Sequence, residues 1–241
     1  MPIQYIDSFT ATTATDTSTS ISVTTTSADV QFQVALIVTN ERTDASTPDV
    51  ITPPSGWTNL TAYGGGNGSN RETAVLSYNA PNTLPSSGTF TWTFGIASRA
   101  IIILSRYADI TVLKTASGQR TLIPTLYTAQ VNPGVGQRLV ICGFAQRASI
   151  TMSNFELRQT GTVGGQASAT LVGSMTSRAA QTTSFSGTQF TNMVGYLADT
   201  VVATTSTLYN GQATSPSTQE GAGLIATFGF EPGRSSIPSI F

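Results

Sequence analysis

The residues able to perform acid–base chemistry in this chain are carboxylates, because the sequence contains no histidine. The absence of histidine removes the commonest general base, the Ser-His-Asp triad and most zinc sites. A hydrolytic enzyme would therefore need a pair of carboxylates, as glycoside hydrolases use. The acids are scattered and none lies in a dense motif: Asp7, Asp16, Asp29, Glu41, Asp44, Asp49, Glu72, Asp109, Glu156, Asp199, Glu220 and Glu231. We predict that the protein is not an enzyme and that it holds no metal or cofactor.

Two loops have compositions close to ligand-binding motifs without meeting their requirements. Asp44 and Asp49 share one polar loop that could bind calcium, but the alternating acidic ligands of a calcium loop are missing. Gly64 to Gly68 is rich in glycine, but no Lys-Ser/Thr pair follows it and no helix begins there, as phosphate binding would require. A solvated loop or a hairpin tip explains both segments.

Aromatic residues near the glycine-rich loop offer a different kind of site, a platform for a sugar. Trp57, Tyr63 and Tyr78 are the candidates, and for Trp57 we favour packing in the core. Tyr63 lies beside the glycines and is the ring that we expect to be exposed. The sequence therefore leaves open a ligand-facing loop that includes Tyr63, Asn67 and Asn70, with a surface glycan as its partner.

Composition and charge limit the partners. Only 10% of the residues are charged and 39% are hydrophobic, but 11 Phe, 7 Tyr and 2 Trp indicate a folded chain rather than a disordered one. The formal net charge of -1 gives no basic field, so we expect neither nucleic acid nor a membrane as partner. A surface so poor in charge suits a protein that is locked into an assembly.

Cys142 and the N-terminus bear on redox chemistry and location. Cys142 is the single cysteine, so no internal disulfide can form, and its apolar neighbours Leu139 to Ile141 predict a buried, inert thiol. Residues Met1 to Phe9 lack the basic and apolar regions of a signal peptide. We therefore expect a protein that is made in a cytoplasm.

The elements that must position any site are β-strands. Ala100 to Tyr107 is the most continuously apolar run, with three adjacent isoleucines that favour a strand covered on both faces. Gly223 to Phe230 echoes it near the end of the chain. In Thr89 to Ile96, Phe90, Trp92 and Phe94 alternate with threonines, which predicts a half-buried strand with its rings in the core.

The second half of the chain repeats the order of the first half less clearly. Leu139 to Ala145 corresponds to Val34 to Asn40, and Met193 to Val202 has helical spacing but β-branched residues that favour a strand. We predict an all-β fold, an antiparallel, jelly-roll-like β-sandwich of two loosely repeated halves with extended N- and C-terminal arms. The expected segments are residues 1–20 as an arm or first strand, one domain at 21–232 with halves at about 21–110 and 120–232, and a docking tail at 233–241.

One turn carries a family resemblance. With its sequence Pro53-Pro54-Ser55-Gly56-Trp57-Thr58, the chain resembles β-sandwich proteins of tailed bacteriophages. In that group an apolar strand precedes this turn, and an alternating aromatic/Thr strand leads into a hydrophobic strand. The similarity covers roughly residues 20 to 232, although the second half lacks a matching turn near Ile150 to Leu157.

The resemblance implies a virion component, such as a capsid decoration protein, a head fibre or a tail appendage, with the major capsid or tail proteins as partners. A carbohydrate-binding adhesin module of a tail appendage is the alternative. The apolar chain ends have no strand pattern around them that would bury their side chains. We therefore expect assembly contacts, with a homo-oligomer as one outcome, at Ile3, Ile6, Ile237, Ile240 and Phe241.

Overall fold

The computed structural model describes residues 3–15, 17–26, 32–41, 49–65, 71–79, 87–108, 114–121, 125–160, 170–183, 192–205, 207–217 and 221–229. Every regular element in these ranges is a β-strand, and every pairing between named strands is antiparallel. The expected all-β antiparallel sandwich is therefore confirmed. The strands are β1 Gln4–Thr12, β2 Ser18–Thr25, β3 Phe32–Glu41, β4 Ile51–Thr52, β5 Trp57–Gly65, β6 Arg71–Asn79, β7 Gly88–Ala108, β8 Lys114–Thr121, β9 Thr125–Tyr127, β10 Gly136–Gln146, β11 Ser153–Thr160, β12 Thr170–Ser174, β13 Thr176–Thr183, β14 Met193–Thr204, β15 Leu208–Thr214 and β16 Gly221–Gly229.

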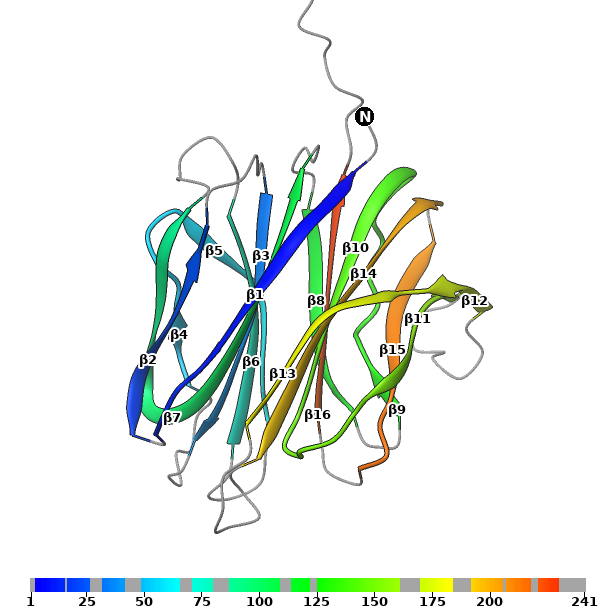
Figure 1. Cartoon of the computed structure of the whole chain (residues 1–241). Coiled ribbons are helices and arrows are strands. Elements are labelled where there is room, and N and C mark those ends of the chain that lie inside the picture. Colours follow the sequence, from blue (N-terminus) through cyan, green and yellow to red (C-terminus); the bar gives the residue numbers. More distant parts are fainter. Residues whose placement is uncertain are drawn as a thin grey trace, which may run out of the picture.

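The strands form three sheets that stack as four layers (Figure 1). One sheet has the order β1-β7-β3-β6-β5, and β2 and β4 also pair with β7. The second sheet has the order β13-β14-β10-β16-β8, and the third has the order β12-β11-β15-β9. The first sheet supplies two layers because β7 is long and curved. Its first part pairs with β2 and β4, and its second part pairs with β1 and β3.

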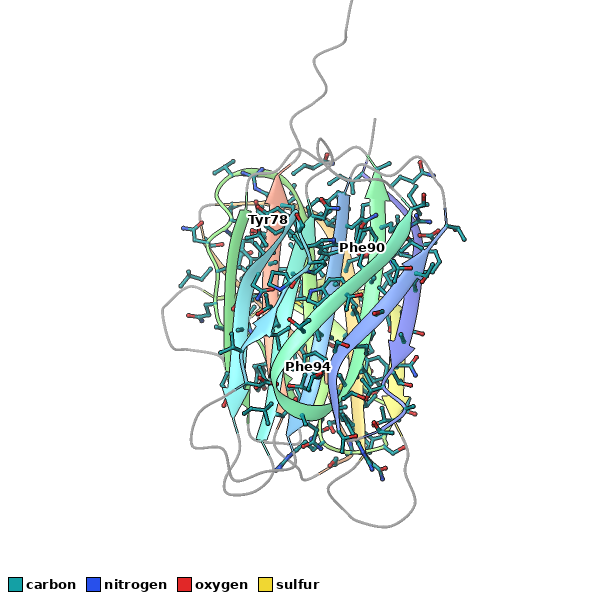
Figure 2. All side chains as sticks on the ribbon, turned by 90° about the vertical axis from the view of Figure 1, so that its left-hand side faces the viewer. Tyr78, Phe90 and Phe94 are labelled. Atoms are coloured by element: carbon teal, nitrogen blue, oxygen red, sulfur yellow. The ribbon has the colours of Figure 1, made fainter. Side chains whose placement is uncertain are left out.

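Strand β7 joins two segments that the sequence predicted as separate strands, Thr89 to Ile96 and Ala100 to Tyr107. The bend lies at Gly95 and Ile96, whose backbone N–H groups donate to Asp49 Oδ1 at 2.8 and 3.1 Å. Figure 2 shows β7 curving close to Phe94. The carboxylate of Asp49 satisfies backbone donors at the bend, so the strand continues from the outer layer into the inner one.

The two halves of the chain have the same strand order. The inner sheet of the first half has the order β1-β7-β3-β6-β5. It matches the inner sheet of the second half, which has the order β8-β16-β10-β14-β13 when it is read from β8. In the outer layers, β2 and β4 flank the first part of β7 as β9 and β11 flank β15. The echo of Ala100 to Tyr107 in Gly223 to Phe230 thus falls on the equivalent strands β7 and β16. Only β12 has no partner in this scheme among the described strands.

The contacts between the two inner sheets are reciprocal. Strand β1 packs against β13, and β5, which corresponds to β13, packs against β8, which corresponds to β1. In the same way β7 contacts β14, and β16 contacts β6. Such exchange of equivalent elements is the pattern of an isologous, two-fold packing. The two halves therefore face each other as the subunits of a symmetric dimer would.

A hydrophobic cluster lies between each pair of neighbouring layers. The central cluster joins the two halves and includes Val34, Leu36, Ile141 and Leu224. A second cluster, around Trp57 and the aromatic residues of β7, fills the first half. The third, around Cys142 and Phe144, fills the second half. Strands β3 and β10 are apolar on both faces because each lies in an inner sheet between two of these clusters.

Several expected strands have different limits in the structure. Strand β9 ends at Tyr127, and Val131 beyond it forms only an isolated bridge with Tyr209. The segment from Met193 to Val202 is a strand, as its β-branched residues favoured. Of the two alternatives for residues 1–20, the first strand is correct for Gln4–Thr12, which pairs with β7. Residues 233–241 lie outside the described ranges.

Candidate functional site

The Pro53–Thr58 turn that carries the family resemblance is a tight β-turn that returns the chain to the core. The N–H of Trp57 donates to the carbonyl of Pro54 at 3.0 Å, and Gly56 has a φ of 80°. Glycine with positive φ in the third position is the requirement of a type II turn. The turn delivers Trp57 into β5, where the ring is 5% exposed. The function of this turn is therefore local and structural.

The aromatic rings considered for a sugar platform do not share a surface. Trp57 packs edge-on against Trp92 at a centroid distance of 4.9 Å, within the cluster of the first half. Tyr78 belongs to the central cluster on the opposite side of the inner sheet and lies 6.2 Å from the ring of Phe228. Tyr63 is half-buried and packs against that same central cluster. Asn67 and Asn70 lie outside the described residues, so the structure places only Tyr63 of the expected ligand-facing loop.

The first described carboxylate, Asp7, fixes β1 to the sheet. It forms a bidentate ion pair with Arg106 on β7, whose side chain is fully buried. Arg106 also donates to the carbonyl of Thr26 at 2.6 Å, and its guanidinium lies 4.8 Å from the ring centroid of Phe9. A buried arginine needs such a full set of partners. The ion pair of Asp7 therefore attaches the N-terminal strand β1 to β7.

The second carboxylate, Asp199 on β14, lies between the two halves and is 1% exposed. Tyr107 on β7 donates its hydroxyl to Asp199 Oδ2 at 2.7 Å, and Nε of Arg178 on β13 lies 2.9 Å from the same oxygen. Burial raises the pKa of Tyr107, and the nearby charge of Asp199 raises it further, so the phenol remains a hydrogen-bond donor. The guanidinium of Arg178 also covers the ring of Tyr5 at 4.3 Å.

Glu72 on β6 is 4% exposed. Burial raises the pKa of this carboxyl to about 8, and the charge of Arg147 opposes the shift. Glu156 on β11 forms an ion pair with Arg158 at 2.6 Å. Together with Asp49, Asp7 and Asp199, these are the carboxylates whose side chains the structure describes, and each occupies a structural position.

Neither a thiol nor a metal centre adds reactive chemistry to the described part of the chain. Cys142 is fully buried in β10, and burial raises the pKa of its thiol, so the nucleophilic thiolate is disfavoured. Within the ranges that the structure describes, no group of three His, Cys, Asp or Glu side chains is arranged to hold a metal ion. Likewise, no helix long and apolar enough to cross a membrane occurs in those ranges.

The expected assembly residues are only partly described. Ile3 packs against the central cluster of its own chain, and Ile6 is half-buried on β1. Ile3 therefore contributes to the core of its own chain. Ile237, Ile240 and Phe241 lie outside the described residues.

Two surface regions of the structure contain none of the expected site residues. The outward face of β2 and β7 carries hydroxyls that pair across the strands, Ser22 with Thr91 at 2.7 Å and Thr24 with Thr89 at 2.9 Å. At the other side of the molecule, Leu171 and Val172 on β12 are 51% and 37% exposed (Figure 1). The alternation of threonine with aromatic residues indicated the first region, whereas no pattern distinguished β12 from a buried strand.

Comparison of the chain with protein-family models, with curated proteins and with solved structures gives no significant match. The function is therefore argued from the chain's own residues and surfaces.

Proposed function

We propose that this chain is a bacteriophage virion structural protein that assembles on the outside of the particle. It would serve as a capsid decoration or head protein, or as a tail or fibre component, after synthesis in the host bacterial cytoplasm. The observation that carries the proposal is that carboxylates and tryptophans, which could form a catalytic or sugar-binding site, serve the packing of the fold. Asp7, Asp49 and Asp199 hold separate segments of the chain together, and Trp57 and Trp92 pack in the core. The outward face of β2 and β7 carries hydroxyls.

The strand order of each half supports this proposal. In each half an inner sheet of five strands faces an outer layer, and the last strand segment lies between the first and the third. We propose that each half is a jelly roll, an architecture common in viral capsid domains. The resemblance at Pro53 to Thr58 points to the same class of protein. A fold of this kind is compatible with many functions, so the particle itself must supply the test.

The test is the protein content of purified virions. Particles from an infected or induced culture are purified on two successive density gradients and analysed by mass spectrometry, with a parallel culture that produces no particles as control. We expect peptides of this chain to co-sediment with the major capsid or tail proteins at a constant ratio across the particle band. Absence from the particle band, or a ratio that changes across it, would refute the proposal.

A further inference from the structure

The duplicated fold provides an internal comparison that isolates β12. In the first half, only residues 53–56 lie between β4 and β5, and they form the tight turn. In the second half, β12 lies between the equivalent strands β11 and β13. Because the first half forms both of its layers without such a strand, the shared fold does not require β12. This added strand needs another explanation.

Within the described part of the chain, β12 has one edge that no strand pairs with. It pairs only with β11, and no other described strand covers its second edge. Its sequence, T-L-V-G-S, contains no charged residue, as is also true of the edge strands β5 and β9, whereas the edge strands β1, β8 and β13 contain Asp7, Lys114 and Arg178. Leu171 and Val172 are the only neighbouring pair among the exposed large hydrophobic residues that the structure describes. An uncharged apolar edge of this kind is a template for an added strand.

The chain itself contains a segment with matching composition. The last described strand, β16, ends at Gly229, and residues 230–241 follow it. Residues 235–241 have the sequence S-S-I-P-S-I-F, with no charge and with Ile237, Ile240 and Phe241 as apolar residues. Fully extended, residues 230–241 would span about 40 Å. In Figure 1, β16 ends at the top of the molecule and β12 projects from its right-hand side.

We propose that residues 235–241 of one copy add as a strand to the free edge of β12 in a neighbouring copy. Backbone hydrogen bonds along the edge hold the segment, and its apolar side chains cover Leu171 and Val172. Pro238 lacks an N–H donor, which an outermost strand tolerates. The inference rests on the proposed assembly role and names the contact between copies. Because donor and acceptor surfaces differ, the contact is heterologous and leads to rings or chains.

The test measures association of the purified full chain by sedimentation velocity over a concentration series. We expect the wild type to form oligomers, and both a deletion of residues 234–241 and Leu171→Lys to sediment as monomers. Mixing these two variants should restore a one-to-one complex, because one keeps the acceptor edge and the other keeps the donor tail. Val201→Lys is the matched control, since Val201 is 44% exposed on β14 away from this edge, and it should associate as the wild type does.

Four outcomes would overturn the proposal: a monomeric wild type at every concentration, a tail-deleted chain that still associates, two variants that fail to complement, or a control that loses association. If Leu171→Lys does not fold, a fluorescent peptide of residues 230–241 replaces it. The peptide must bind the tail-deleted protein and lose at least tenfold in affinity against Val172→Lys. If the chain is present in virions but its copies do not associate, only this contact is refuted. If the copies associate but the chain is absent from virions, only the proposed function is refuted.

Discussion

The hydroxyl of Tyr107 donates a 2.7 Å hydrogen bond to Asp199, and this bond connects β7 of the first half to β14 of the second half. Both side chains are 1% exposed. The central cluster around them is apolar and would allow the two inner sheets to shift relative to each other. A buried, directional contact between a neutral donor and a carboxylate specifies one position of the two inner sheets relative to each other. Buried polar groups have this role in other interfaces.

Replacing Tyr107 with Phe should destabilise the protein by about 1–3 kcal/mol. The substitution removes a hydrogen bond to a buried carboxylate, which is worth more than a neutral one, while Arg178 still compensates the charge. The measurement is urea unfolding at pH 7. Tyr5→Phe is the control, because that hydroxyl bonds Ser8 at a half-exposed position, and it should cost less than about 1 kcal/mol. Equal losses for the two variants would contradict a special role for the Tyr107–Asp199 bond.

Glu72 should make stability depend on pH. Because burial raises its pKa from the ordinary value of 4.5 to about 8, the folded state binds a proton that the unfolded state releases. Its contribution to stability is complete below about pH 4.5 and is lost as the pH rises towards 8. For a single group the slope is at most about 1.4 kcal/mol per pH unit.

The measurement is the free energy of unfolding of wild type and Glu72→Gln at a series of pH values from 5 to 9. The variant should lack this part of the slope and become more stable relative to the wild type as the pH rises. Glu156→Gln removes a carboxylate from the Glu156–Arg158 pair, where each side chain is about a quarter exposed, and it serves as control. Parallel profiles for wild type and Glu72→Gln would show that Glu72 is not the group responsible.

The buried aromatic face of β7 was predicted from the alternation in Thr89 to Ile96 and is confirmed. Phe90, Trp92 and Phe94 are 6%, 0% and 7% exposed, and Figure 2 labels Phe90 and Phe94 on the same strand. Trp92→Ala should cost about 3–5 kcal/mol because it empties a large site in the core. Thr91→Ala, on the opposite face, should change stability by no more than about 0.5 kcal/mol. Thermal and urea unfolding of both variants test the register, and equal losses would disprove it.

The sequence predicts the strands that lie between two hydrophobic layers, because their apolar residues have no polar face to interrupt them. Strands β3, β10 and β16 were found in this way, whereas β14 was predicted from the β-branched residues in Met193 to Val202. The sequence does not predict β8 or β13, because both segments, K-T-A-S-G-Q-R-T and T-S-R-A-A-Q-T-T, are mostly polar. Such edge strands form because a neighbour supplies backbone partners, here β16 and β14. The pairing, rather than their own residues, makes them strands.

The site residues show a similar division. The turn at Ser55 and Gly56 and the burial of Trp57 follow from local residue chemistry, and both were predicted. The contacts of Asp199 with Tyr107 and Arg178 join residues 92 and 21 positions apart, and no local pattern indicates them. The relation between the halves was visible in the echo of Ala100 to Tyr107 at Gly223 to Phe230 and in the correspondence of Leu139 to Ala145 with Val34 to Asn40. Their face-to-face packing depends on which sheet surfaces meet, which the echo does not contain.

Gly211 on β15 tests how closely the second half is packed. A Cβ atom at this position would lie 2.3 Å from Cys142 Sγ, so one of the two strands would have to move. Gly211→Ala should therefore cost about 1–3 kcal/mol, as overpacking of a core does. Gly173→Ala on β12 is the control, because an added Cβ there meets no atom within 4 Å, and it should be close to neutral.

A second substitution shows whether the clash with the thiol causes the loss. Cys142→Ala removes the sulfur and leaves a small cavity that costs some stability by itself. If Sγ is the obstacle, the double variant Gly211→Ala/Cys142→Ala should be more stable than the sum of the single losses predicts, by at least about 0.5 kcal/mol. Urea unfolding of all four proteins gives this coupling energy. Strict additivity would mean that the added methyl group clashes elsewhere, for example with Thr128, whose Cγ2 lies 3.3 Å from the same position.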